Sequence, residues 1–296
     1  MSKVQWERMF PDELEAAIHA CPVVYLPYGL CEPHGLHNAV GLDALKAHGI
    51  CCRAAKKHGG IVAPPDYWHV HEIGAYASWA DLTVGEVRPW LSALPPWMHF
   101  KNVCYHVRGS DALAFHAALL VTGHYGPNWE DLKALLEILQ PHFAMRMYGL
   151  PDFEANKPGF DNDEKSGGDH AGKVETSLLW SLEPDCVDVS RLPDPDDANL
   201  PFAMAASAHQ SDRQTGERMV DDEVKWLGRK AQELLQDYQK HKPDVRKPVS
   251  FDQVEHIWEN EVRPRLGEFK SMQYLDREPP APSSRWQLNY RIPDHS

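Results

Sequence analysis

The chain contains short apolar segments rich in β-branched residues, separated by longer stretches with helical periodicity. Residues 23–27 and 117–122 are apolar at nearly every position, which is typical of strands buried on both faces of a parallel sheet. A shorter segment, residues 61–64, has the same character. These three segments predict strands of one sheet.

The stretches between these segments predict helices and loops. A strand, a helix and a second strand in this order form a βαβ unit, so we expect a parallel sheet with helices on its faces. Gly59-Gly60 is a C-terminal capping signal, and Pro127 suits the first turn of a helix. Helices are predicted over residues 12–20, 43–58, 84–108 (interrupted at Pro95-Pro96), 128–139, 215–238 and 251–262, and one after Gly172. Loops are predicted over residues 65–82, 151–169 and 184–201, and an extended tail over 279–296.

Residue types that bind metals follow the first predicted strand. Glu32 and His34 are two positions apart, so on an extended backbone their side chains point to the same side. Asp43 comes after a glycine-containing loop, at the start of the next predicted helix. Two carboxylates and an imidazole gathered at a strand end outline a divalent-metal site.

Two later segments carry residues of the same kind. His124 directly follows the apolar segment 117–122, so we expect it at the same edge of the sheet. Asp169 and His170 precede a predicted helix whose first turns, including Glu175, should face that edge. The chain therefore brings a second and a third motif to the candidate site.

The candidate metal ligands are three carboxylates and two imidazoles: Glu32, His34, Asp43, His124 and Glu175. They can hold two divalent ions if one carboxylate bridges, and Asp43 is the natural bridge. Oxygen and nitrogen ligands without thiolate suit zinc, manganese or iron. Two such ions activate a water molecule and polarise a carbonyl oxygen. His170, with Asp169 fixing its tautomer, could deliver a proton to a departing nitrogen.

The predicted loop 65–82 is rich in aromatic residues and histidines. In a parallel α/β sheet such a loop lies over the carboxyl ends of the strands, where ligands bind. Trp68 and His71 are therefore candidates for binding the substrate. The alternative is that these side chains only cover the core.

Composition narrows the possible functions. A net charge of −13 argues against a nucleic-acid-binding surface, and no Gly-x-Gly-x-x-Gly follows a predicted strand. No apolar stretch approaches the roughly 20 residues of a membrane span, and the N-terminus lacks a signal-peptide layout. The six cysteines show no Cys-x-x-Cys spacing, so we expect a cytoplasmic protein without a disulfide framework.

Three segments together resemble the creatininase (creatinine amidohydrolase) family, over about residues 20–235. They are Glu32-Pro33-His34-Gly35 with Asp43, Gly123-His124-Tyr125-Gly126-Pro127-Asn128, and Asp169-His170-Ala171-Gly172 before Glu175-Thr176-Ser177. The resemblance implies a three-layer α/β/α fold with a mostly parallel central sheet, a two-metal site at its carboxyl edge, and a homo-oligomer, commonly a hexamer. The family-like domain would cover residues 1–240. Residues 241–296 would be a C-terminal extension packing on it or on a neighbouring subunit.

The resemblance also implies an activity, the hydrolysis of a non-peptide C–N bond in a small cyclic or formyl amide by a metal-activated water. Glu32, His34, Asp43 and His124 would be metal ligands, and Glu175 a ligand or a catalytic group close to the ions. His170 resembles the proton-donating histidine of the family. Tyr125 matches a tyrosine beside the metal, where it would contribute to catalysis and substrate binding.

The chain departs from the family pattern at three positions. Gly126 stands where creatininase has a glutamate ligand, Lys173 where many members have glutamate, and Ser166 where a tryptophan closes over creatinine. These differences point to a substrate other than creatinine. The alternatives left open are a formamide or peptide-end hydrolase of the same family, and a non-catalytic metal-binding protein that serves assembly.

Overall fold

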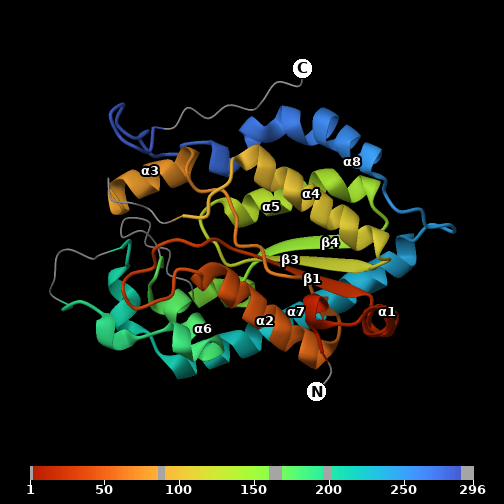
Figure 1. The fold of residues 1–296 in the computed structure, drawn as a ribbon, viewed down its shortest axis with the longest axis horizontal. Helices are drawn as coiled ribbons and strands as arrows, with labels where there is room; N and C mark the ends of the chain where they lie inside the picture. Colours follow the sequence, from red (N-terminus) through yellow and green to blue (C-terminus); the bar gives the residue numbers. More distant parts are fainter. Residues whose placement is uncertain (1–2, 86–90, 160–168, 196–201, 288–296) are drawn as a thin grey trace.

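Four parallel strands form the central sheet, in the order β2-β1-β3-β4 (Figure 1). The computed structural model describes residues 3–85, 91–159, 169–195 and 202–287. All three strand pairs are parallel, and β1 pairs with β3 along its whole length. The strands are β1 (Val23–Tyr28), β2 (Ile61–Val62), β3 (Ala117–Thr122) and β4 (Arg146–Pro151).

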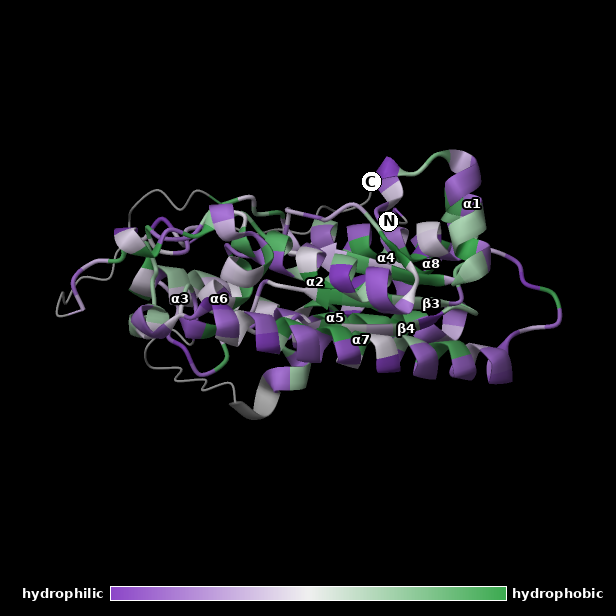
Figure 2. Cartoon of the chain, turned by 90° about the horizontal axis from the view of Figure 1, so that it is seen from below, coloured by the Kyte–Doolittle hydropathy of each residue, from purple (hydrophilic) through white to green (hydrophobic). Residues whose placement is uncertain are grey.

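Helices cover both faces of the sheet, so the fold has the three layers that the resemblance implies. α4, α5 and α8 lie on one face, and α2, α6 and α7 lie on the other (Figure 1). Figure 2 shows hydrophobic strands between helices that carry hydrophilic residues on their outer sides. The helices are α1 (Pro11–Ala20), α2 (Leu42–His58), α3 (Gly74–Thr83), α4 (Pro96–Ala112), α5 (Asn128–Leu139), α6 (Lys173–Leu182), α7 (Arg213–His241) and α8 (Phe251–Ile257).

The central strands contribute alternate side chains to the two layers. Val24 and Leu26 of β1 pack in the core with α4 and α5, whereas Val23 and Tyr25 pack with α2 and α7. All six residues of β1 and all six of β3 are buried. This burial on both faces explains why the two segments are apolar at nearly every position.

The strands expected from the apolar segments are confirmed, as are the helices after β1 and β3. Two predictions for the intervening region are wrong. The predicted loop 65–82 contains most of α3. Of the predicted helix over 84–108, residues 91–95 are not helical and α4 begins at Pro96, because a residue that precedes a proline, as Leu94 and Pro95 do, is disfavoured in the helical conformation. Parts of the predictions lie outside the described residues: Ser166, residues 160–168 and 196–201 of two loops, residues 86–90 of that helix, and residues 288–296 of the tail.

The segment after α7 packs against the α4 side of the sheet. Val254, Ile257 and Trp258 are buried in the same hydrophobic core as α4 and α5. Asp111 of α4 accepts a hydrogen bond from Arg246 Nη2 at 2.8 Å. The core on this side is therefore completed by residues that follow α7 in the sequence.

The predicted extended tail is wrong for its first part, because residues 282–286 form turns that bury Trp286. Trp286 packs with Ala77 and Ala80 of α3, and its Nε1 donates a hydrogen bond to Gly85 O at 2.8 Å. The tail thus reaches back to the region between β2 and α4. No helix in the described ranges combines the length and the apolar character needed to cross a membrane.

Gly216 in α7 is expected to be required for the packing of α7 on α6. A Cβ at Gly216 would lie 1.8 Å from the carbonyl oxygen of Ser177 in α6, so a larger residue must push the helices apart. Gly216→Ala should lower the free energy of unfolding by about 1–3 kcal/mol. Urea denaturation followed by circular dichroism measures this change.

Gly109→Ala is the matched control, because a Cβ at this position of α4 meets no atom within 4 Å. It should leave stability unchanged or raise it by about 0.5–1 kcal/mol, since alanine is the better helix former. Equal unfolding midpoints for the two variants would contradict the packing argument.

Candidate metal centre

The candidate metal centre lies beyond the carboxyl ends of the two central strands. Glu32 and His34 follow β1, and His124 follows β3 two residues after its end. From this pair of strands the sheet continues to β2 on one side and to β4 on the other. Open α/β sheets bind ligands at such a point, where the strand order reverses.

Two glycines allow the start of α2 to approach these strand ends. A Cβ on Gly29 would lie 2.2 Å from Ala44 N, and a Cβ on Gly123 would lie 2.1 Å from Asp43 O. A side chain at either position would force α2 away from the sheet. The glycines therefore place Asp43, in the first turn of α2, beside the residues that follow β1 and β3.

Buried donor atoms form two groups that share Asp43. Glu32, Asp43 and His124 make one group, and His34, Asp43 and Glu175 make the other. Within each group the three donor atoms lie within 4.8 Å of one another. The structure thus brings together all five residues that the sequence predicts as metal ligands.

The two imidazoles face different oxygens of Asp43. His124 Nδ1 lies 3.2 Å from Asp43 Oδ2 and 3.1 Å from Glu32 Oε1. His34 Nε2 lies 3.1 Å from Asp43 Oδ1 and 3.7 Å from Glu175 Oε2. Asp43 therefore has the position of a carboxylate that could bridge two ions.

Backbone carbonyls fix the tautomers of the two imidazoles. His34 Nδ1 donates to Glu32 O at 3.1 Å, and His124 Nε2 donates to Val70 O at 3.2 Å. Since a carbonyl oxygen only accepts, the other nitrogen of each neutral ring carries the lone pair. Ligating histidines in metalloproteins are held in this way by an outer acceptor.

The chemistry of the donor atoms fits a divalent cation. Both carboxylate oxygens of Asp43 and Nε2 of His34 are buried, and among the described residues they make no well-aligned hydrogen bond, only the close approaches between Asp43 and the two imidazoles. Burying a carboxylate is costly unless it is paired or coordinates a metal. The five donors include no thiolate, which suits zinc, manganese or iron.

Charge pairing stabilises the centre in the metal-free protein. Burial would lower the pKa of His34 and His124, but the surrounding carboxylates outweigh it and raise the pKa to about 9 and about 10, respectively. Burial would raise the pKa of Glu32 and Asp43, but the imidazoles outweigh it and hold both pKa values below their usual range. Without metal at neutral pH, Glu32 and Asp43 are therefore ionised, and His34 and His124 are protonated.

His170 lies beside the centre but is not paired with Asp169. Its ring stacks on His34 with centroids 4.4 Å apart, and its Nε2 donates to Pro33 O at 2.8 Å. Asp169 Oδ2 instead accepts a hydrogen bond from Glu175 N, at 2.8 Å. The prediction that Asp169 fixes the tautomer of His170 is wrong, because the start of α6 requires a capping group and Asp169 provides it.

A buried lysine that the sequence analysis misses lies next to Glu175. Lys46 Nζ donates to Glu175 Oε1 at 3.1 Å and to Tyr125 Oη at 3.0 Å, and it lies 3.6 Å from Asp152 Oδ2. Burial would lower the pKa of Lys46, but Asp152 and Glu175 outweigh it and raise the pKa. The sequence feature that could have revealed Lys46 is its position about one turn after Asp43, on a face of α2 that otherwise carries apolar, buried residues.

The residues predicted to bind the substrate lie in different environments. Trp68 is 54% exposed, so its side chain is largely turned to solvent. His71 is buried, with Nε2 3.0 Å from Glu32 Oε2. The Tyr125 hydroxyl donates to Asp152 Oδ1 at 2.6 Å. The structure thus brings His71 to the centre and directs the Tyr125 hydroxyl to the buried group around the lysine.

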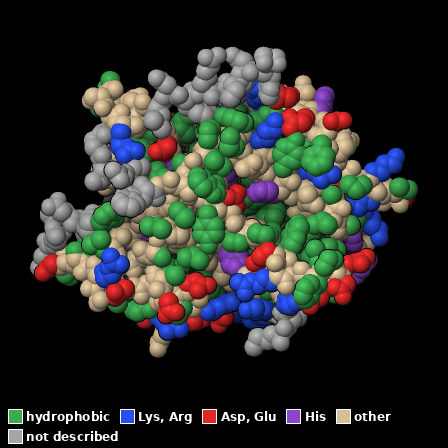
Figure 3. All heavy atoms as spheres, in the orientation of Figure 1, with side chains coloured by type: hydrophobic (Ala, Val, Ile, Leu, Met, Phe, Trp, Pro, Cys, Tyr) green, Lys and Arg blue, Asp and Glu red, His purple; other side chains and the backbone are tan. Residues whose placement is uncertain are grey.

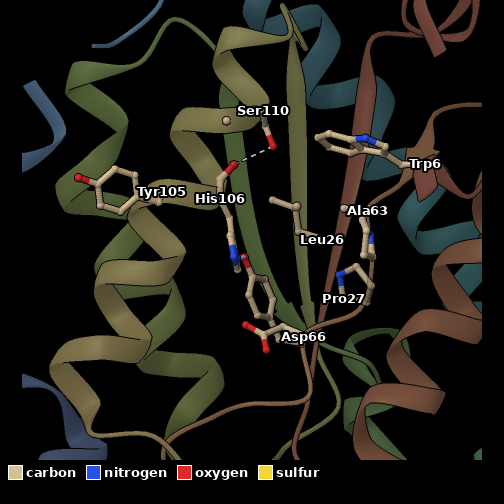
Figure 4. A pocket seen from close by; sticks show the side chains of 11 residues that line it. Trp6, Leu26, Pro27, Ala63, Asp66, Tyr105, His106 and Ser110 are labelled. Carbon is tan, nitrogen blue, oxygen red and sulfur yellow. Dashed lines mark hydrogen bonds between the residues drawn. The ribbon is translucent and has the colours of Figure 1, made fainter. Parts of the chain in front are cut away.

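A separate cavity of about 320 Å³ lies between α4, β1 and the segment after β2 (Figure 4). The face of the molecule seen in Figure 3 is largely hydrophobic near its middle. The cavity is lined mainly by apolar and aromatic side chains, together with Asp66 and His106. None of its lining residues belongs to either donor group, so the cavity is distinct from the candidate metal centre.

The sequence matches the model of the family Creatininase, described as creatinine amidohydrolase, over residues 7–237. The chain belongs to the creatininase family. Membership implies a metal-dependent amidohydrolase, and it confirms the resemblance stated from the motifs. A creatinine amidohydrolase from Pseudomonas putida is 27% identical over 209 residues, which cover 64% of this chain and 75% of that protein.

Solved creatininase structures have the same fold. A mutant creatininase of the Zn-Zn type superposes with a TM-score of 0.62 at 23% identity, covering 82% of this chain and all of that one. A manganese form of creatininase superposes with a TM-score of 0.61 at 23% identity, covering 81% and 100%. These likenesses confirm the predicted three-layer α/β architecture.

Zinc binding to the metal-free protein is expected to release protons. His34 and His124, with pKa values of about 9 and about 10, are protonated near neutral pH and must lose a proton to bind a metal. Zinc affinity should therefore increase with pH until it passes these pKa values. Calorimetric titration in buffers of different ionisation enthalpy measures the number of protons released.

The same pKa values predict the pH dependence of stability without metal. Both imidazoles have a higher pKa in the folded protein than in the unfolded chain, where it is near 6.5. Their pairing with the carboxylates therefore stabilises the fold fully below pH 6.5. This stabilisation is lost as the pH rises through the folded-state pKa values of about 9 and about 10. The assignment of protonated imidazoles would be contradicted if the metal-free protein released no protons on binding zinc and kept its stability up to a pH of about 10.

Lys46→Met is expected to destabilise the metal-free protein by about 3–5 kcal/mol, because it leaves buried carboxylates without their cation. The partners affected are Glu175 and Asp152. Lys225→Met is the control, since Lys225 pairs with Asp222 at the surface and such pairs contribute about 0–1 kcal/mol. Urea denaturation of both variants tests this, and similar losses would show that the buried pairing contributes little.

Proposed function

We propose that the protein hydrolyses a C–N amide bond of a small cyclic or linear amide with two divalent ions bound at the candidate metal centre. The observation that carries this proposal is the sharing of Asp43 between two buried donor groups. When bound, the ions would supply an activated water and polarise the substrate carbonyl. The remaining tasks fall to side chains of this chain.

Three groups fix the orientation of Glu175. Its Oε2 accepts a hydrogen bond from Ala171 N at 2.7 Å, and its Oε1 accepts one from Lys46 at 3.1 Å. Its backbone N–H is bound by Asp169, which anchors the first turn of α6. These contacts hold Glu175 Oε2 at 3.7 Å from His34 Nε2 and leave Glu175 Oε1 little freedom.

His170 is the residue proposed to move a proton. Burial and the neighbouring His34 lower the pKa of His170, so it is neutral at neutral pH. Its Nε2 donates to Pro33 O, which leaves Nδ1 as the nitrogen that can accept a proton. A neutral imidazole can take a proton from the attacking water and then give it to the departing nitrogen.

An aromatic side chain limits the space beside His170. The Trp79 ring lies 4.7 Å from the His170 ring and 5.9 Å from the His71 ring. A substrate that reaches His170 therefore meets a flat apolar surface, which favours a small planar amide. The relative named creatinine amidohydrolase supports a cyclic amide as the substrate class, and formamides or peptide ends remain the second candidate.

Two histidine variants should separate metal binding from proton transfer. His124→Ala is expected to lose metal and all turnover, because it removes a donor shared with Glu32 and Asp43. His170→Ala should keep its metal but lose about 100- to 10,000-fold in kcat, the usual contribution of a general acid–base group. Elemental analysis and assays on creatinine, other small cyclic amides, formamides and short peptides measure both quantities.

The control is His99→Ala, which removes a buried histidine outside both donor groups. It should retain the metal content and the activity of the parent protein. Circular dichroism checks that all variants are folded. Undiminished turnover in His124→Ala, or a parent protein that binds no divalent metal, would refute the proposed function.

A further inference from the structure

Two neighbouring rings contact the imidazole of His170. The ring of His34 stacks on it with centroids 4.4 Å apart, and the Trp79 ring lies 4.7 Å away, tilted by 58°. The hydrogen bond from His170 Nε2 to Pro33 O fixes one nitrogen, but the ring can still turn about this bond. Contact with the two rings therefore determines where Nδ1 of His170 points.

Trp79 belongs to α3 and is held there by a tryptophan from the tail. It packs in a small hydrophobic cluster with Ala77 and Ala80 of α3 and with the buried Trp286. Trp286 Nε1 also donates a hydrogen bond to Gly85 O, just beyond the end of α3, at 2.8 Å. The indole of Trp286 therefore supports the helix that carries Trp79.

A serine of the tail reinforces this support. Ser284 Oγ donates to Asp81 Oδ1 at 2.6 Å and accepts a hydrogen bond from Trp286 N at 3.2 Å. Asp81 follows Trp79 by two residues in α3. The tail is thus bound to the same stretch of helix by polar and by apolar contacts.

The start of α3 is held by a second segment that follows α7. Gly74 has a φ of +56°, and a Cβ there would lie 2.2 Å from Ser271 O, so the two backbones are in direct contact. Ser271 N and Lys270 N donate to the two carboxylate oxygens of Asp131 in α5, at 2.8 and 2.6 Å. Both ends of α3 are therefore fixed by residues beyond position 237, where the family match ends.

α3 lies between these C-terminal residues and the candidate metal centre. On the side of the centre, Tyr76 donates to Tyr125 O at 2.7 Å and stacks on His124 with centroids 4.9 Å apart. Trp286 itself comes close, since its ring centroid is 6.1 Å from that of His71. A displacement of α3 would therefore change the packing of the rings at the centre.

We propose that Trp286 is a positioning residue for His170 and acts through Trp79. It holds α3 in the place where the Trp79 ring limits the rotation of the His170 ring and directs its Nδ1. This inference rests on the proposed function, because the histidine that is positioned is the one that would move the proton. The tail beyond the family match thus completes the part of the centre that handles the proton.

The positioning role predicts a loss of rate and not of metal binding. Neither tryptophan belongs to the two donor groups, so the zinc content should stay that of the parent. Small displacements of a catalytic group can cost about 100-fold in rate. We therefore expect Trp79→Ala and Trp286→Ala to lower kcat by about 10- to 100-fold on the amide that the parent hydrolyses, with a smaller change in KM.

Nuclear magnetic resonance observes the His170 ring without relying on turnover. The zinc-loaded protein is labelled with carbon-13 at histidine Cε1, and the signal of His170 is identified by its absence from His170→Ala. This signal should shift in Trp79→Ala, because the ring current of the indole is lost. It should also shift in Trp286→Ala, because Trp79 moves.

Trp226→Ala is the matched control. Trp226 is a partly buried tryptophan of α7 that packs against the core on the α2 side of the sheet and contacts Arg229 and Lys230. Its truncation also removes an indole from a hydrophobic contact. It should leave the His170 signal, the zinc content and the kcat of the parent unchanged.

The outcomes separate this inference from the proposed function. An unshifted His170 signal in Trp79→Ala or in Trp286→Ala would overturn the inference, and so would shifted signals with the kcat of the parent. If the parent hydrolyses none of the tested amides, the proposed function fails, and the His170 signal alone decides whether Trp286 positions this ring.

A milder variant keeps the test decisive if Trp286→Ala does not fold. Trp286→Phe removes the hydrogen bond to Gly85 O and keeps an aromatic ring in the cluster. The His170 signal should then shift by a smaller amount than in Trp79→Ala. A signal that stays at the position of the parent would overturn the inference.

Discussion

The arrangement of the whole site depends on one buried carboxylate, Asp43, held between His34 and His124. Its oxygens are inaccessible to water, so their charge must be balanced by protonated imidazoles or by metal ions. The carboxylate reaches this position because α2 begins very close to the ends of β1 and β3. That approach in turn requires Gly29 and Gly123, where any side chain would collide with the backbone of α2.

The remaining donors come from separate rigid elements. β1, β3 and the first turn of α6 each end or begin at the centre, so the relative positions of the candidate ligands are fixed by the packed core. Outer groups then set the orientation of individual side chains, as Val70 O does for His124 and Lys46 does for Glu175. A site built in this way can keep its geometry while the loops around it vary.

The sequence predicts those parts of the molecule that depend on local pattern. β1 and β3 are recognisable because they are buried on both faces, and the five candidate ligands because each follows a strand or opens a helix. β4 is not predicted, since Arg146, Gly149 and Pro151 interrupt its apolar pattern and its strand character comes from pairing with β3. Lys46 is missed because its partners are distant in the sequence, and the neighbours Asp169 and His170 suggest a pairing that the capping of α6 prevents.

The burial of Trp286 has a consequence for how members of the family can differ. This residue lies outside the part of the chain that is shared with the family, yet its ring contacts a histidine that faces Glu32. The surroundings of the candidate metal centre are therefore partly built from a segment that lies outside the family match. A change in this segment can therefore alter what lies around His71 while the candidate donor residues stay the same.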